Sequence, residues 1–101
     1  MTYAYTYDVP IGPEIYAEIK NGLGPDSPDG LIAHLAYRID SGLRYLDVWR
    51  SQEDCKRFVE ERLHPVVDEV LLRTLGFRPP EPSKTTLDVI DAWIGPQPAA
   101  V

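Results

Sequence analysis

His34 is the residue of this chain best suited to acid–base chemistry, because imidazole exchanges protons near neutral pH. It lies within an alternating segment that predicts a strand, and Asp47 and Trp49 lie in the next such segment. A histidine across from Trp49 and close to Asp47 is placed to act as a general acid or base on a small ligand. The alternative is a structural histidine that bonds a neighbour or crosses a dimer interface, because buried polar groups need partners whether or not they react. Both interpretations stay open at this point.

Four residues accompany His34 as candidate substrate-binding side chains: Arg38, Tyr45, Asp47 and Trp49. Arg38 and Tyr45 can steady a developing enolate or phenolate, and Trp49 can pack against an aromatic ring. Arg38 and Asp47 are also suited to an ion pair across neighbouring strands. Most aromatic residues are expected in the core, with two or three reaching a ligand: Tyr3, Tyr5, Tyr7, Tyr37, Tyr45, Trp49 and Trp93.

The other reactive residues do not form a cofactor or metal motif. The chain has no glycine-rich nucleotide loop, no nucleophile elbow and no HExxH pair. Its two histidines, His34 and His64, are far apart in sequence, and Cys55 lies on the apolar stripe of a predicted helix. We therefore expect no metal site and no cofactor, a core position for Cys55 and a surface position for His64.

The hydrophobic patterns predict the element order β-α-β-β-α-β. The strands are expected at 2–9, 31–39, 44–50 and 85–94, and the helices at 14–23 and from the N-cap Ser51 to Gly76, with a kink or break at Pro65. This order indicates the α+β class and a ferredoxin-like fold, in which both helices cover one face of a four-stranded antiparallel sheet. We expect one domain over 1–94 and a flexible tail over 95–101. The turn-rich loop 24–30 is either a surface connection or a mobile lid.

The segment 31–50 predicts a hairpin with two distinct faces. A turn over 40–43 pairs His34 with Trp49, Ala36 with Asp47 and Arg38 with Tyr45 on a polar and aromatic face. Two helices cover only one face of such a sheet, so a second copy is the expected cover of the other, and a homodimer is predicted. The opposite face is largely aliphatic: Leu31, Ala33, Leu35, Tyr37, Ile39, Leu46 and Val48.

Four segments resemble the dimeric α/β-barrel superfamily, in particular its antibiotic biosynthesis monooxygenase-like members. They are residues 30–34 (GLIAH), 40–43 (DSGL), 46–54 (LDVWRSQED) and 58–65 (FVEERLHP). The resemblance covers 30–65 by sequence and the flanks by element order. It implies a dimeric α/β barrel, a homodimer with a pocket between sheet and helices in each subunit, and a His34/Trp49 face turned toward that pocket.

The resemblance also implies a cofactor-independent enzyme that acts on a small aromatic or polyketide-like molecule, by proton transfer followed by cyclisation or by reaction with O₂. His34 is then the acid or base, and the substrate contacts are Trp49, Arg38, Tyr45 and Asp47. Two alternatives use the same fold. One is a non-catalytic homodimer that binds a small ligand or a partner protein, and the other is a structural dimer whose aromatic residues fill the core.

Composition limits the remaining partners. Sixteen acidic and ten basic residues give a formal net charge of −6, which is not the charge pattern of a nucleic-acid-binding protein. No apolar run is long enough to cross a membrane. The first residues form neither a basic leader nor an apolar run, and the single Cys55 cannot form an internal disulfide. These features are typical of a reducing compartment, and we expect a cytoplasmic protein.

Overall fold

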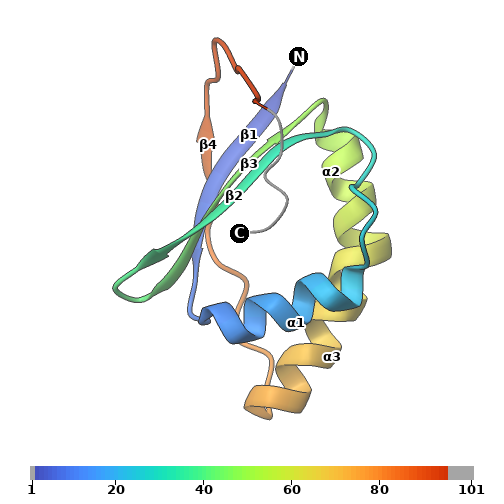
Figure 1. Ribbon diagram of the computed structural model, residues 1–101, viewed down its shortest axis with the longest axis vertical. Coiled ribbons are helices and arrows are strands. Elements are labelled where there is room, and N and C mark those ends of the chain that lie inside the picture. Colours follow the sequence, from blue (N-terminus) through green and yellow to red (C-terminus); the bar gives the residue numbers. More distant parts are fainter. Residues whose placement is uncertain (1, 96–101) are drawn as a thin grey trace.

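The computed structural model describes residues 2–95, which form a four-stranded antiparallel sheet with helices against one face (Figure 1). The sheet order is β2-β3-β1-β4, which makes β1 and β3 the central strands. This α+β arrangement is compatible with a ferredoxin-like fold. The strands are β1 (Tyr3–Val9), β2 (Leu31–Ile39), β3 (Gly42–Trp49) and β4 (Thr85–Leu87). The helices are α1 (Pro13–Leu23), α2 (Gln52–Phe58) and α3 (His64–Leu75), with a π-helical turn η1 (Val59–Leu63) between the last two.

The pleat of β1 turns its tyrosines toward the helices, because alternate side chains of a strand point to the same face. Tyr3, Tyr5 and Tyr7 follow one another on this face, and their ring centroids are 5.3 and 5.7 Å apart in sequence order. Tyr5 lies opposite Asp47 of β3, and Tyr7 lies opposite Tyr45. The predicted strand 2–9 is confirmed, and its aromatic face continues across β3.

The hairpin of β2 and β3 has a tighter turn than predicted. Ile39 pairs with Gly42, so residues 40–41 alone connect the strands, and His34 pairs with Asp47. The predicted register is wrong by two residues, but a shift of two keeps side chains on their predicted face because the period of a strand is two. The other predicted pairs of this face change accordingly: Ala36 pairs with Tyr45, and Arg38 pairs with Leu43.

A bulge at Ile32 moves Leu31 to the face that the helices cover. Leu31 pairs with Trp49 while Ala33 pairs with Val48, so Ile32 is the extra residue in β2. Leu31 packs against the buried cluster that contains Trp49. Its predicted place on the aliphatic face is therefore wrong, because the bulge interrupts the alternation from which that place was derived.

Pro65 is accommodated by a widened helical turn. A proline lacks the backbone N–H, and its ring collides with the carbonyl four residues earlier in a regular α-helix. The residue four positions before it, Glu61, lies in the π-helical turn η1, and α3 begins at His64.

The hydroxyl oxygen of Ser51 accepts a hydrogen bond of 3.1 Å from the backbone N–H of Asp54, which confirms the predicted N-cap.

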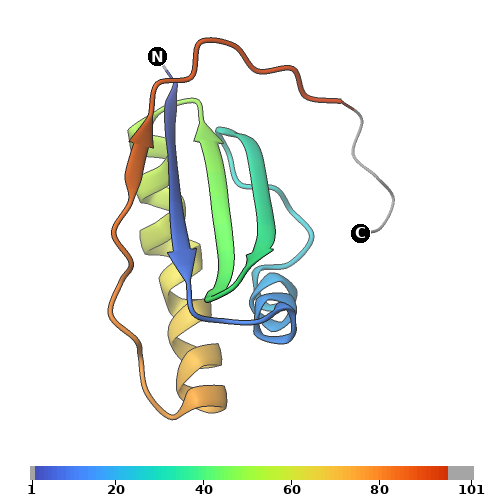
Figure 2. The same cartoon turned by 90° about the vertical axis from the view of Figure 1, so that its left-hand side faces the viewer.

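The last strand is much shorter than the predicted 85–94. Thr85 to Leu87 pair with Thr6 to Ala4 of β1, and β1 begins only one residue earlier, at Tyr3, so it could pair at most one more residue of this strand. Residues 88–95 leave the sheet without regular structure (Figure 2). Ile90 and Trp93 in this segment are 94% and 93% exposed. The expected tail, 95–101, lies outside the described residues except for Gly95.

The aliphatic core lies between α1, α3 and the hairpin end of the sheet. Pro13 begins α1, Gly24 follows its end with φ +84, and Ile19 is its buried residue. Leu43 and Tyr45 of β3 face this helix side, so α1 and α3 close over the same end of the sheet. The buried members are Ile11, Ile19, Leu43, Tyr45, Val70 and Leu71.

Replacing Gly42 with alanine should destabilise the protein more than the same change at Gly76. Gly42 has φ +146, and a Cβ atom there would lie 2.2 Å from the carbonyl oxygen of Val9. Gly76 also has a positive φ, +81, but its Cβ position is open. We expect Gly76→Ala to cost about 1 kcal/mol in free energy of unfolding, and Gly42→Ala roughly twice that or more. Urea unfolding followed by circular dichroism measures both, and equal losses would contradict the close approach at Gly42.

Candidate functional site

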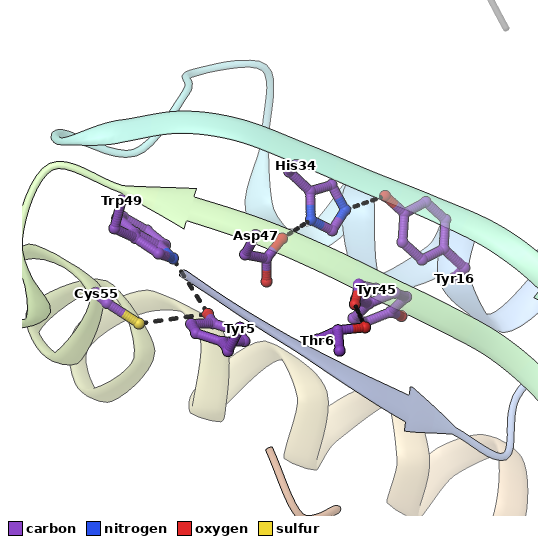
Figure 3. A network of polar contacts seen from close by, with 8 residues as sticks. All are labelled: Tyr5, Thr6, Tyr16, His34, Tyr45, Asp47, Trp49 and Cys55. Atoms are coloured by element: carbon purple, nitrogen blue, oxygen red, sulfur yellow. Dashed lines mark hydrogen bonds and ion pairs between the residues drawn. The ribbon is translucent and has the colours of Figure 1, made fainter. Parts of the chain in front are cut away.

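Asp47 and His34 form the polar centre of the aromatic face (Figure 3). Asp47 Oδ1 is hydrogen-bonded to His34 Nδ1, and the aspartate is only 6% exposed. An ionised carboxylate only accepts hydrogen bonds, so the imidazole carries a hydrogen on Nδ1. In the neutral ring, His34 Nε2 is then left as an acceptor. The pairing therefore sets the tautomer of the histidine.

Tyr16 of α1 extends this pair to a chain of three side chains. Its hydroxyl oxygen lies 2.7 Å from His34 Nε2, and with the tautomer above the phenol donates to the imidazole. The two rings are almost parallel, with an angle of 5° between their planes. Sequence reasoning did not include Tyr16 among the site residues and missed this role. The available signal was that a buried phenol needs a partner for its hydroxyl group.

A cavity of about 310 Å³ lies between the sheet and the helices. Its walls include His34, Asp47 and Tyr16, so the three-residue chain faces this cavity. Of the four predicted substrate contacts, Tyr45, Asp47 and Trp49 line the cavity. Further aromatic lining comes from Tyr5 and Tyr7, which belong to the aromatic residues considered from the sequence, and from Phe58, which was not considered as a ligand contact.

Arg38 is the predicted contact that the structure places elsewhere. It is exposed, pairs with Leu43 near the hairpin turn and does not line the cavity. The tighter turn brings it two residues closer to the hairpin end of β3 than predicted. Asp47 bonds His34 instead, so the expected ion pair of Arg38 with Asp47 is not formed among residues 2–95.

The aromatic floor of the cavity contains a second buried hydrogen-bond network. Trp49 Nε1 donates to the hydroxyl oxygen of Tyr5 at 3.1 Å, and that oxygen lies 3.4 Å from Cys55 Sγ. All three residues are buried, which confirms the predicted core position of Cys55. These bonds hold the ring of Trp49 at the floor beside the three-residue chain (Figure 3).

The loop 24–30 forms a wall of the cavity and is tied to the helices. Arg62 of η1 donates hydrogen bonds of 3.0 and 3.1 Å to the carbonyl oxygens of Leu23 and Asp26. The guanidinium also lies over the ring of Phe58, 5.3 Å from its centroid. His64 was predicted at the surface, and its side chain is 40% exposed. It also lines the cavity, where its Nε2 lies 2.7 Å from a carboxylate oxygen of Glu81.

Four phenols around the cavity are held in their protonated form. Burial is the largest cause that raises the pKa of Tyr5, Tyr7, Tyr16 and Tyr45, and the negative charge of Asp47 raises all four further. For Tyr45 the neighbouring Tyr16 also contributes. These side chains therefore present O–H donors, and not phenolates, to the cavity and to one another at neutral pH.

Among residues 2–95, no group of three or more His, Cys, Asp and Glu side chains is arranged to hold a metal ion. No helix in the same part of the chain is both long and apolar enough to cross a membrane. Comparison of the sequence with models of known protein families and with curated proteins found no match.

The protein should lose stability as the pH rises above about 10, where tyrosines ionise in the unfolded chain. The cavity tyrosines have higher pKa values in the folded protein than in the unfolded chain. Below about pH 10 their contribution to the free energy of unfolding is therefore complete. It is lost as the pH rises toward the folded-state pKa values. Each such phenol contributes a slope of up to about 1.4 kcal/mol per pH unit. Urea unfolding at several values between pH 8 and 11 measures the slope. Tyr7→Phe should make it shallower, and an unchanged slope in this variant would contradict this explanation.

Proposed function

We propose that this protein is a small cofactor-independent enzyme that moves a proton on an aromatic or polyketide-like substrate and thereby starts its oxygenation or cyclisation. The observation that supports this most is the chain of Asp47, His34 and Tyr16 in an aromatic cavity of about 310 Å³. That volume is in the range of small-molecule sites, which combine apolar walls with a few polar groups. The resemblance of residues 30–65 to antibiotic biosynthesis monooxygenase-like proteins supports the same function and a dimeric α/β barrel.

In the proposed reaction Tyr16 meets the substrate and His34 acts through it, because both imidazole nitrogens are already engaged. The phenolic oxygen of Tyr16 takes a proton from the substrate as its own proton passes to His34 Nε2. Asp47 stabilises the imidazolium that forms. A concerted transfer produces no free phenolate, which suits a tyrosine whose pKa burial has raised. His34 is thus the base, and Tyr16 connects it to the substrate.

The product of this step is a substrate enolate or phenolate, which the O–H groups of the cavity tyrosines can stabilise. Such an anion can attack a carbonyl group of the same molecule and close a ring. It can also react with O₂. At a methylene carbon, one oxygen atom then stays as a carbonyl oxygen and the other leaves as water. The substrate supplies all the electrons, so the reaction requires no cofactor.

Conservative changes in the three-residue chain should abolish turnover without unfolding the protein. With an anthrone as a phenolic test substrate, O₂ consumption should fall about 100-fold or more in His34→Gln and in Tyr16→Phe, and less in Asp47→Asn. Glu60→Gln and Glu69→Gln, at exposed positions outside the cavity and away from the outer face of the sheet, are the matched controls and should keep the wild-type rate. Unchanged rates in His34→Gln and Tyr16→Phe would exclude the proposed roles. Binding without turnover by the wild type would favour the ligand-binding alternative.

The proposed active form is a homodimer in which a second copy covers the outer face of the sheet. Leu35 and Tyr37 on that face are 53% and 46% exposed, and the segment after β4 exposes Ile90 and Trp93 almost completely. Large apolar side chains exposed in this way are typical of an interface. A two-fold arrangement would cover the face of both copies at once.

A charge on the outer face should prevent this association. We expect wild-type protein to sediment as a dimer and Leu35→Glu to sediment as a monomer with its helical circular dichroism retained. Leu72→Glu is the matched control, since Leu72 is 54% exposed but lies on α3. A monomeric wild type, or a Leu35→Glu variant that stays dimeric, would contradict the proposed interface.

A further inference from the structure

Lys84 lines the cavity from the β4 edge of the sheet, and His34 lines it from β2 at the other edge. Lys84 directly precedes β4, and its Nζ is 4.2 Å from the ring centroid of Tyr5 and 5.8 Å from that of Tyr7. Both rings belong to the aromatic face that lines the cavity, so the ammonium group lies over that face. Among residues 2–95, Lys84 forms no ion pair.

The nearby carboxylates of the cavity already have partners. Asp47 bonds His34. Glu81 lies 2.7 Å from His64 Nε2 and 3.8 Å from a guanidinium nitrogen of Arg78. The remaining acidic residue of the lining, Asp26, belongs to the loop 24–30. Arg62 binds the backbone carbonyl oxygen of Asp26 there. The β4 side of the cavity thus presents a positive charge without a carboxylate partner, in a chain whose net charge is −6.

The strand order sets the distance between this charge and the proton-transfer groups. His34 lies on β2 and Lys84 beside β4, at the two edges of the sheet. Three strand spacings, about 14 Å, separate these edges, but the ammonium group lies over Tyr5 of β1, so about two spacings, or roughly 10 Å, separate it from β2. A ligand that touches both ends must therefore be elongated. The aromatic floor between them, formed by Tyr45 and Tyr7, favours flat rings.

We infer that the cavity takes an elongated aromatic acid, whose carboxylate binds Lys84 and whose reacting hydroxyl or methylene group lies at Tyr16. The placement of the reacting group at Tyr16 rests on the proposed function. The binding of the carboxylate to Lys84 does not depend on turnover. Contact with the faces of Tyr5 and Tyr7 engages one side of the ammonium group. Its N–H donors stay available for a charge-assisted hydrogen bond, which is stronger than a neutral one.

A matched pair of ligands tests the carboxylate end directly. Isothermal titration calorimetry compares 4′-hydroxybiphenyl-4-carboxylate with its uncharged carboxamide, which has nearly the same shape. Wild-type protein should bind the carboxylate about tenfold more tightly, the value expected of one charge-assisted hydrogen bond. Lys84→Gln should remove this preference and leave the affinity for the carboxamide unchanged, while Lys84→Arg should keep it. Lys56→Gln, on α2 and outside the cavity, should behave as wild type.

The inference is overturned if wild-type protein shows no preference, or if the preference survives in Lys84→Gln. The His34→Gln variant separates this result from the fate of the proposed function. It should lose turnover but keep the preference for the carboxylate, because it leaves Lys84 in place. A preference for the carboxylate in a protein that turns over no phenolic substrate would overturn the proposed reaction and support the acid-binding cavity.

Discussion

The charge of Asp47 is the constraint around which the site is arranged. A carboxylate buried on a central strand is unfavourable unless it is paired and hydrogen-bonded. His34 meets this need from the neighbouring strand, and the bond determines which imidazole nitrogen is free to accept from Tyr16. The same charge contributes to the raised pKa of the four cavity tyrosines Tyr5, Tyr7, Tyr16 and Tyr45. One buried anion thus sets the tautomer of the base, and it adds to the effect of burial that keeps the surrounding phenols protonated.

Sheet geometry explains why these groups meet although they are distant in sequence. β1 and β3 are the central strands, and their pairing places Tyr5 opposite Asp47 and Tyr7 opposite Tyr45. β2 adds His34 from one edge, and the chain entering β4 adds Lys84 from the other. The helices contribute Tyr16, and they leave the opposite face of the sheet open (Figure 1). The cavity therefore combines residues from nearly the full length of the described chain.

Much of this could be predicted from the sequence, and the failures have physical causes. The β-α-β-β-α-β order and the helix start at Ser51 follow from local patterns. The two-residue period of a strand was enough to place His34, Tyr45 and Asp47 on one face. This period does not determine the pairing register of β2 and β3, so the two-residue turn was missed and Arg38 was expected in the site. The role of Tyr16 depends on how α1 packs over β2, and the end of β4 depends on where β1 begins. Such tertiary facts leave no periodic signal.

The π-helical turn before Pro65 has a consequence for how this chain could change over time. A turn of this kind is equivalent to one residue inserted into an α-helix. Deleting one residue from Val59–Leu63 would restore regular winding and rotate the two flanking helices relative to each other by about 100°. Arg62 would then turn away from the carbonyl groups of Leu23 and Asp26 that it now binds. Length variation among descendants of this sequence should therefore be tolerated in the exposed turn at 40–41 far more readily than in this helix.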